Sequence, residues 1–587
     1  MKKKILGINA YHGDSAACIV VDGELIAAVE EERFKRVKHW AGFPAESISY
    51  CLSEANITLK DIDYVAINTD PRANFFEKVV YSVFRRPNLS LIYDRLAKSK
   101  KKKSIKDEFE IAFPDDKFNG EVKYIEHHLS HLASAHLVSP FDHSVVVSVD
   151  GFGDFSSGSW GVGNGNIIQI DKNIHFPHSL GIFYQAFTQY LGFPHFGDEY
   201  KVMGLAPYGK PKFLDQLRKV VKPARDGSYK LSLKYFTHHK GIVDHGNIDG
   251  VPSVSNLFNQ KNVEMLLGFP PRVPDDEMQE FHFDLAHSVQ AMYEEIFFYM
   301  LNGLHDNYKI DNLTLAGGCA NNSVANGKVY RMTPFKNMYI AASAGDSGGA
   351  IGAAFAELSN ITTDKSTKLF SMEHAYYGPS YSNTYIASLL KERKESLSNF
   401  SIKKIDNAQV LCQTVAKMIT NDNVIGWFQG RMEWGPRALG NRSILADPRK
   451  ENMKDIINSK IKKRESFRPF APSILRENVS EWFEEDDDVP FMMQVFLIKE
   501  DKRKLLPAVT HVDGSGRLQT VSHNSNPLYH MLISAFNDIT NVPILLNTSF
   551  NENEPVVCKP EEALDCFLRT SMDAVVLGNY IVSREIV

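Results

Sequence analysis

Short apolar runs separated by polar, glycine-containing turns make up the start of the chain. Residues 5–9 are apolar, residues 11–15 are mostly polar, and apolar runs at 16–21 and 24–30 are joined by Asp22-Gly23. Apolar runs of this length between turn residues predict β-strands, and Asp-Gly between two of them predicts a hairpin. The chain is therefore expected to open with three short strands.

Residues 144–170 repeat this order. An apolar run that ends at Asp150 is followed by a glycine loop, a strand, a tight turn and another strand. Two copies of one strand pattern predict a duplicated α/β domain, in which the first loop of each copy faces one cleft. The polar residues expected at that cleft are His12, Asp14, Asp150 and Asp154. Ordinary turn carboxylates are the alternative, most of all at Asp154.

The segment 126–136, just before the second copy, is rich in histidine and contains no glycine or proline. Its apolar residues recur at three-to-four spacing, which predicts a helix. His127 and His131 stand one turn apart on such a helix, and two imidazoles at that spacing can bind one divalent metal. His128 and His131 are also neighbours, and a histidine-rich structural helix has the same pattern. Spacing alone leaves these interpretations open.

Two later loops place polar groups next to predicted helix starts. Residues 197–209 put two carboxylates and a lysine at the head of a short helix, and residues 313–323 run from a strand through two glycines into another helix. Exposed amides at a glycine turn can approach a phosphate or a sugar, although one glycine pair is weak evidence. The candidates in these loops are Asp198, Glu199, Lys201, Gly317, Gly318, Asn321 and Asn322.

Asp346 follows the predicted strand 339–341 and is surrounded by small residues. Its carboxylate could complete a site of two histidines and one aspartate. The competing role is that of a cap for the helix that follows, which the position alone favours.

The second half carries most of its cations in loops. The loop 430–444 contains three arginines among small residues, and arginine forks match the geometry of phosphate. We therefore interpret it as an anion site rather than a solvated loop, although some nearby cations are helix C-terminal charges. The candidates are Arg431, Arg437, Arg442, Lys463, Arg468, His511 and Arg517, with Asn547 and Ser549 at the end of a buried-type strand.

Composition narrows the class of protein. A chain of 587 residues is too long for one ordinary core, so two or more domains are expected. A net charge of −5 argues against a general nucleic-acid binder, and the basic run 95–106 is interpreted as a solvated loop. No apolar run reaches the roughly 18 residues of a membrane span. Six cysteines without a Cys-x-x-Cys pair fit a reducing cytoplasm.

These blocks together resemble the actin-like, sugar-kinase-like ATPase superfamily. They are most similar to the TsaD-like enzyme that attaches threonylcarbamoyl groups to tRNA, through the His-x-x-x-His helix, the loop 317–322 and the later aspartate. The opening 9–17 departs from that enzyme and resembles the NodU/CmcH-type O-carbamoyltransferases of nodulation-factor, cephamycin and aminoglycoside pathways. The second-half motifs 434–437 and 547–551 are similar to the family's YrdC-like carboxyl-terminal domain.

The resemblance implies an α/β fold with a duplicated actin-like domain at 1–360, a linker at 361–370 and a YrdC-like α/β domain at 371–587. It implies metal ligation by His127, His131 and Asp346, with the register of the motif selecting His127 over His128. Fe²⁺ is the metal expected from the family, and the ligand types also permit Zn or Mn.

The resemblance also implies two reactions. In the second domain, carbamoyl phosphate and ATP with Mg²⁺ would give carbamoyl-adenylate, with contacts from the arginine-rich loops. Lys201 and the loop 317–322 of the first domain would bind the nucleotide or the carbamoyl-adenylate. In the first domain, the carbamoyl group would pass to a hydroxyl of a sugar-containing or secondary-metabolite acceptor. His12 is the candidate base, and Asp14, Asp198 and Glu199 would orient acceptor or nucleotide.

Four other classes remain open at this point. A tRNA-modifying transferase shares both folds, but a pI near 6.5 weighs against it. A non-heme iron oxygenase uses two histidines and one carboxylate. A sugar kinase or chaperone-like ATPase gives the arginine loops no role, and a non-catalytic scaffold does not explain the polar strand ends. The sequence does not name the acceptor, and it is compatible with a homo-oligomer.

Overall fold

The computed structural model describes residues 3–85, 104–240, 246–248, 250–462 and 467–584. The chain forms two compact units. Unit 1 comprises Met1–Glu32, His39–Asn322 and Val329–Met372, and unit 2 comprises Arg33–Lys38, Ser323–Lys328 and Glu373–Val587. Two short segments that precede residue 373 thus belong to unit 2. In one of them, Arg36 Nη1 and Nη2 donate to the carbonyls of Val556 and Pro555 at 2.8 and 2.6 Å.

Unit 1 contains two five-stranded sheets of the same design. The first has the order β3-β2-β1-β4-β5 and the second β8-β7-β6-β13-β14. In each, three antiparallel strands from consecutive hairpins continue into two parallel strands. This repetition confirms the predicted duplication. The strands are β1 (Lys4–Asn9), β2 (Ala16–Val21), β3 (Glu24–Glu30), β4 (Tyr64–Ile67), β5 (Glu121–Tyr124), β6 (His143–Gly153), β7 (Ser156–Asn164), β8 (Ile167–His175), β13 (Asn312–Ala316) and β14 (Asn337–Ile340).

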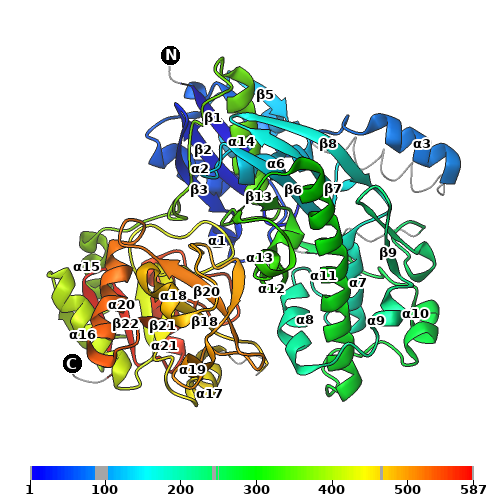
Figure 1. Cartoon of the computed structure of the whole chain (residues 1–587). Helices are drawn as coiled ribbons and strands as arrows, with labels where there is room; N and C mark the ends of the chain where they lie inside the picture. The colour runs from blue at the N-terminus through cyan, green and yellow to red at the C-terminus, as the bar shows by residue number, and fades with distance from the viewer. Residues whose placement is uncertain (1–2, 86–103, 241–245, 249, 463–466, 585–587) are drawn as a thin grey trace. The chain divides into compact units, whose positions relative to one another are not determined.

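Helices α6 (His127–His136) and α14 (Gly348–Ile361) pack together between these sheets (Figure 1). The close approach depends on small residues: a Cβ at Gly352 would lie 1.7 Å from the carbonyl oxygen of Ser130. Because the two backbones meet directly, α14 fixes the position of α6 and of its histidines.

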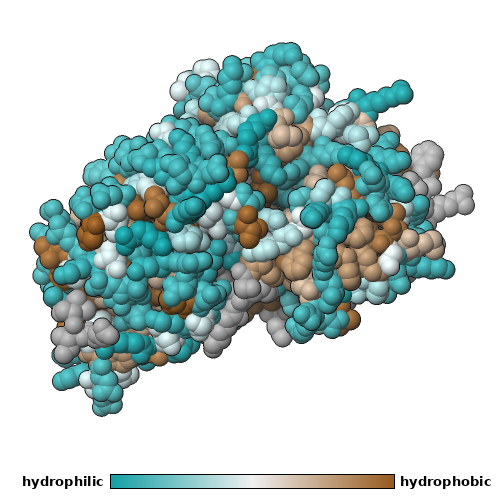
Figure 2. Space-filling model, turned by 60° about the horizontal axis from the view of Figure 1, so that its bottom comes forward, coloured by the Kyte–Doolittle hydropathy of each residue, from teal (hydrophilic) through white to brown (hydrophobic). Residues whose placement is uncertain are grey.

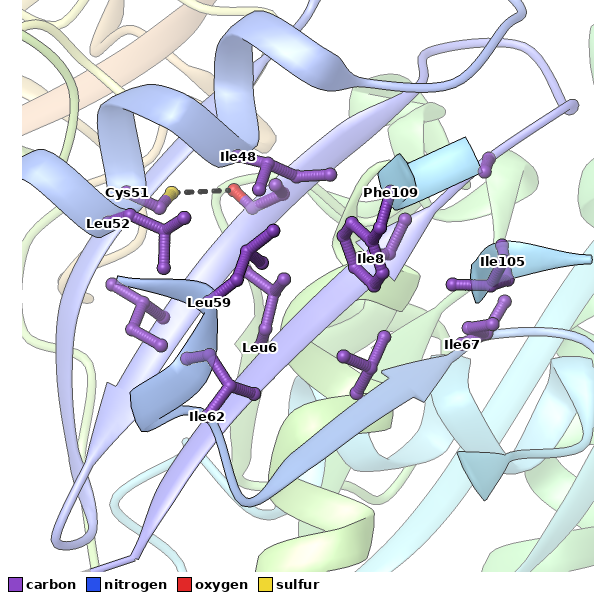
Figure 3. Packing of buried hydrophobic residues seen from close by; sticks show 14 of the residues in the cluster. Leu6, Ile8, Ile48, Cys51, Leu52, Leu59, Ile62, Ile67, Ile105 and Phe109 are labelled. Carbon is purple, nitrogen blue, oxygen red and sulfur yellow. Dashed lines mark hydrogen bonds between the residues drawn. The ribbon is translucent and has the colours of Figure 1, made fainter. Parts of the chain in front are cut away.

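The outer face of the first sheet carries a hydrophobic core. Leu6 and Ile8 of β1 pack with Ile48 of α2 (Ala45–Glu54) and Phe109 of α5 (Ile105–Ala112), as Figure 3 shows. Alternate residues of β1 point to opposite sides, so the same strand faces this core on one side and α14 on the other. The first sheet is therefore packed on both of its faces.

The rest of unit 1 consists of helices and short strands outside the two five-stranded sheets. Helix α11 is 29 residues long and packs along α7, α8 and α9. The bounds are α3 (Phe75–Arg85), α7 (Leu180–Tyr190), α8 (Glu199–Leu205), α9 (Leu214–Leu217), β9 (Val221–Pro223), β10 (Tyr229–Leu231), β11 (Gly246–Ile248), β12 (Val251–Ser253), α10 (Gln260–Leu267), α11 (Glu280–Tyr308) and α13 (Val329–Met332).

Unit 2 is built on one nine-stranded mixed sheet of order β15-β23-β22-β16-β17-β21-β18-β20-β19. Its strands are β15 (Ser401–Lys404), β16 (Ile425–Phe428), β17 (Arg442–Ala446), β18 (Ala471–Leu475), β19 (Gln494–Leu497), β20 (Ser515–Val521), β21 (Ile544–Ser549), β22 (Ala574–Leu577) and β23 (Tyr580–Ser583). Its helices are α1 (Glu32–Lys35, from Arg33 on), α12 (Ser323–Asn326), α15 (Asn383–Glu392), α16 (Ala408–Thr420), α17 (Met453–Ile457), α18 (Val479–Trp482), α19 (Glu500–Arg503), α20 (Pro527–Thr540) and α21 (Pro560–Arg569).

Much of the surface in Figure 2 is hydrophilic, with separate hydrophobic areas between the polar ones. Among the helices of the described ranges, none combines the length and apolar content needed to cross a bilayer.

Candidate active site

The first turn of α6 is fixed by two carboxylates. Glu126 accepts a hydrogen bond from the backbone N–H of Leu129 at 2.7 Å, and Asp154 accepts one from the N–H of His127 at 3.0 Å. Carboxylates are favourable at a helix N-terminus, where backbone N–H groups lack partners within the helix. The two caps set the rotation of α6, and thereby the direction in which its histidines point.

His127 and His131 meet two carboxylates in one buried cluster. Their Nε2 atoms lie 3.0 Å apart. Asp150 Oδ2 lies 3.1 and 3.5 Å from these nitrogens, and Asp346 Oδ1 lies 3.7 and 3.6 Å from them. One ligand atom from each of the four residues falls within 4.8 Å of the others. The predicted trio therefore converges, and Asp150 joins it as a fourth member.

In this cluster, the effect of burial on each pKa is opposed by the charges and hydrogen bonds of the neighbouring groups. Burial lowers the pKa of His131, but hydrogen bonds and negative charge from Asp150 and Asp346 outweigh it and raise the pKa to about 10. Burial raises the pKa of Asp150, yet the two histidines hold it well below its usual range. Two imidazole nitrogens and two carboxylate oxygens are a donor set that suits Fe, Zn or Mn. The residues present therefore fit a divalent metal.

Access to the cluster lies on the side of Asp346. Its side chain is 22% exposed, whereas those of His127 and His131 are 1% and 0% exposed. The N-cap of α14 is Ser347 rather than Asp346, and the Ser347 side chain makes no capping hydrogen bond. The carboxylate of Asp346 thus faces the imidazoles rather than the helix amides.

Two glycines shape the cluster. A Cβ at Gly153 would lie 2.0 Å from the His127 ring, so only glycine leaves room for that ring. The backbone N–H of Gly318 donates to Asp150 Oδ1 at 2.8 Å, which turns Oδ2 toward the histidines. Gly317 precedes it with φ of 86°, a conformation that favours glycine. The loop predicted to approach a phosphate thus also orients a carboxylate.

His128 points elsewhere. Its Nδ1 contacts Ser148 Oγ at 2.9 Å, and burial lowers its pKa to about 3, so this imidazole is neutral at pH 7. The helix register therefore separates His128 from the pair formed by His127 and His131.

His12 and Asp14, the candidates of the loop between β1 and β2, have different surroundings, as does Asp154 of the second copy. The His12 ring lies near the cluster, with its centroid 6.0 Å from that of His127. Asp14 instead pairs with His39, whose Nδ1 lies 2.8 Å from Asp14 Oδ1. Asp154 holds the backbone: besides His127 N it accepts hydrogen bonds from Thr69 Oγ1 at 2.8 Å and from the amide of Asp70 at 2.7 Å.

The residues at the head of α8 form a charged group. Lys201 Nζ lies 3.0 Å from Asp198 Oδ1, and Asp198 is buried. Burial, with a contribution from Asp198, raises the pKa of Glu199 to about 7. The charge of His39 acts in the opposite direction and lowers the pKa of Glu199. This group is thus close to the His39–Asp14 pair.

The two asparagines of the loop 317–322 have different environments. Asn322 exchanges two amide hydrogen bonds with Gln290, at 3.0 and 3.1 Å, and is buried. Asn321 Nδ2 donates to the carbonyl of Gly318 at 3.2 Å, and within the described chain its buried Oδ1 has no hydrogen-bond partner. Asn322 therefore belongs to the framework, and Asn321 keeps an acceptor available.

In unit 2, Arg442 is fully buried beneath the loop 430–441. Its Nη1 donates to the carbonyls of Gln429 and Asn441, at 2.5 and 3.0 Å, and its Nη2 to those of Pro379 and Gly430, at 2.9 and 3.2 Å. Glu433 Oε1 accepts hydrogen bonds from the backbone N–H groups of Leu439 and Asn441 in this loop and from that of Arg442 itself. These bonds place Arg442 in the framework of the loop.

The other arginines of this region are less enclosed. Arg431 donates to the carbonyls of Tyr377 and Gly378, at 2.6 and 3.3 Å. Arg437 has no hydrogen-bond or ion-pair partner within the described ranges, and its Nε is buried. Burial lowers its pKa to about 10, which leaves it cationic at pH 7. Arg468 and Arg517 are partly buried.

The remaining candidates of unit 2 lie in polar networks. His511 Nε2 contacts the carbonyl of Phe467 at 3.4 Å, and burial lowers its pKa. Asn547 Nδ2 donates to Ala438 O at 3.0 Å. Ser549 Oγ and O contact Nζ of Lys462, at 3.2 and 2.6 Å. Lys463 lies outside the described residues.

Two residues that the structure places in the candidate sites are not among the metal ligands and nucleotide contacts predicted from the sequence. Asp150 is expected in the cleft but not among the ligands, although its place at the end of an apolar strand before Gly151 is a usable signal. Lys462, rather than its neighbour, is the lysine that the structure shows bound to Ser549 and Asn551. Residue type alone does not distinguish two adjacent lysines.

Comparison with known proteins identifies the family. The carbamoyltransferase N-terminus family matches residues 4–355, and the carbamoyltransferase C-terminus family matches residues 416–584. An uncharacterized protein of Synechocystis sp. is 40% identical over 612 residues, covering 99% of this chain and 96% of that protein. Nodulation protein NolNO of Sinorhizobium fredii is 38% identical over 98% of this chain and 80% of its own length. The 3'-hydroxymethylcephem-O-carbamoyltransferase of Streptomyces clavuligerus is 33% identical over 41% of this chain and 42% of that enzyme. These matches confirm the resemblance inferred from the motifs, and the chain belongs to the carbamoyltransferase family.

Proposed function

We propose that this enzyme makes carbamoyl-adenylate from carbamoyl phosphate and ATP, and transfers its carbamoyl group to a hydroxyl of a sugar-containing or secondary-metabolite acceptor. The observation that carries the proposal is the cluster of His127, His131, Asp150 and Asp346 in a chain of the carbamoyltransferase family. The named O-carbamoyltransferase among its relatives supports a hydroxyl as the acceptor group.

A divalent cation would be held by the four residues of the cluster. Fe²⁺ is our first candidate, with Zn or Mn as alternatives, and such a cation would polarise a carbonyl or phosphate oxygen as a Lewis acid. Asp150 adds a second carboxylate to the two-histidine, one-carboxylate set typical of non-heme iron oxygenases. This extra ligand favours the Lewis-acid role over oxygen chemistry.

His12 is the proposed base for transfer. Its ring lies 6.0 Å from the His127 ring, and the ordinary pKa of an imidazole is near neutrality. The acceptor oxygen would form a bond to the carbamoyl carbon while the bond from that carbon to the phosphate oxygen of AMP breaks. The acceptor proton would pass to His12, and AMP would leave.

Unit 2 is the proposed place of activation. With one water, carbamoyl phosphate and ATP would yield carbamoyl-adenylate, pyrophosphate and phosphate, and Mg²⁺ would accompany ATP. Crowded phosphate charge needs cations in a site with little water. Arg437 suits this need because it is cationic and partly buried, and has no partner within the described chain. Arg431, Arg468, Arg517 and His511 are further candidates for this contact.

The test is the release of pyrophosphate from ATP by the purified full chain. Release that requires carbamoyl phosphate supports the activation step, and absence of such release overturns it. A panel of nucleotide sugars and glycosides is then screened for a mass gain of one carbamoyl group. If adenylate forms but tRNA alone gains the group, the acceptor half of the proposal is wrong.

A further inference from the structure

Helix α3 carries an apolar stripe on its solvent side. Phe75 and Phe76 are 70% and 73% exposed, and Val79 and Val83 are 42% and 63% exposed. Residues at these spacings share one face of a helix. Single exposed apolar residues are common, but a contiguous patch of a few hundred Å² marks an interaction site.

The stripe is not a misplaced core face, because the other side of α3 is already packed. The ring of Tyr81 contacts those of Phe155 and Phe176, with centroids 5.8 and 5.1 Å apart. At the root of the helix, Asn74 Nδ2 donates to the carbonyl of Asp154 at 2.9 Å. Figure 1 shows α3 at the margin of unit 1, away from its sheets. The helix is thus anchored on one side and presents apolar rings on the other.

The chemistry of the neighbouring sequence indicates what covers the stripe. From residue 85 to residue 106 the chain has nine lysines and arginines, at 85, 86, 95, 98, 100, 101, 102, 103 and 106, against one acidic residue, Asp94. An apolar helix face beside a strongly basic sequence is typical of binding to anionic lipid headgroups. A protein partner is a poorer fit, since four side chains at this exposure offer on the order of 400 Å², about half of what each partner buries in a standard interface.

We propose that the stripe formed by Phe75, Phe76, Val79 and Val83 lies in the headgroup region of an anionic lipid bilayer. This surface is separate from the metal cluster, and the proposal does not depend on the reaction proposed above. Lipid binding through this stripe would hold the chain at a membrane surface.

The test is flotation of the full chain with vesicles of phosphatidylcholine alone or with about 30% phosphatidylserine. We expect binding to the anionic vesicles, at least about tenfold weaker binding to neutral ones, and loss of binding at high salt. The double variant Phe75→Ser/Phe76→Ser should bind anionic vesicles about tenfold or more weakly. Met265→Ser is the matched control, because Met265 is 74% exposed on α10 and should leave binding unchanged.

Three results would overturn the proposal. The chain fails to float with anionic vesicles, the double variant floats as well as the parent chain, or Met265→Ser lowers binding equally. Sedimentation velocity tests the alternative that the stripe binds a second copy of the chain. This alternative holds if the parent chain self-associates, the double variant is monomeric, and neither binds lipid. A thermal unfolding midpoint equal to that of the parent chain shows that the double variant is folded.

Discussion

Gly318 holds Asp150 in the orientation that turns its second carboxylate oxygen toward His127. The Gly318 N–H donates to Oδ1 at 2.8 Å, while Oδ2 of the same carboxylate lies 3.1 Å from His127 Nε2. A hydrogen bond to the outer oxygen of a ligating carboxylate is the kind of support that tunes metal affinity. The loop 317–322 and helix α6 are far apart in sequence, but both contribute to the arrangement of this cluster.

Replacing Gly318 with alanine should therefore weaken metal binding. A Cβ at this position would lie 2.8 Å from Asp150 Oδ1, so the carboxylate must shift. We expect the affinity for Mn²⁺ or Zn²⁺, measured by isothermal titration calorimetry, to fall about 10- to 100-fold. Gly151→Ala is the matched control, because no atom lies within 4 Å of a Cβ built there. Equal affinity in Gly318→Ala and the parent chain would contradict the supporting role.

Removing one imidazole should separate the two proposed reactions. In His127→Ala, carbamoyl phosphate-dependent pyrophosphate release should persist, because that step is assigned to unit 2. Transfer to the acceptor found in the panel should fall by about 100-fold or more, since the cluster loses a ligand. Parallel assays of pyrophosphate and carbamoylated product measure the split. His143→Ala, at an exposed histidine, serves as the control. Loss of both steps in His127→Ala would argue against separate sites.

Arg437 and Arg442 should differ in what their replacement affects, activity in one case and stability in the other. Arg442→Met leaves buried carbonyls without donors and should lower the free energy of unfolding by on the order of 3 kcal/mol. Arg437→Ala removes a side chain without partners in the described chain, so stability should change by about 0.5 kcal/mol or less. Pyrophosphate release in Arg437→Ala should fall about 100-fold. Urea unfolding and the pyrophosphate assay test both; a stable Arg442→Met or an active Arg437→Ala would refute the assignment.

Most strands of the two five-stranded sheets of unit 1 can be predicted from the alternation of apolar runs and turns in the sequence. Strands β2 and β3 begin and end where the apolar runs at 16–21 and 24–30 do, and β6 to β8 repeat them. Such patterns are local, so the sequence contains them directly. The segments 33–38 and 323–328, which join unit 2, depend on contacts such as that from Arg36 to Pro555. No local pattern encodes a partner more than five hundred residues away.

The candidate site can likewise be predicted only in part. Helical spacing suffices to bring His127 and His131 together, but Asp150 joins them through an orientation of its carboxylate that depends on the hydrogen bond from Gly318. Arg437 and Arg442 are identical in type and close in sequence, yet one is enclosed by carbonyls and the other is not. Residue type indicates where charge gathers, whereas burial decides which charge remains available to a ligand.

Glu199 should make stability depend on pH near neutrality. Burial raises its pKa from 4.5 to about 7, so between these values the folded chain keeps a proton that the unfolded chain has lost. The unfolded state then binds fewer protons, and stability falls as pH rises through this window, by at most about 3 kcal/mol, and levels off above it. Glu199→Gln cannot ionise and should abolish that fall. Thermal unfolding midpoints of both chains across the window measure the difference. Parallel curves would show that Glu199 does not retain its proton on folding.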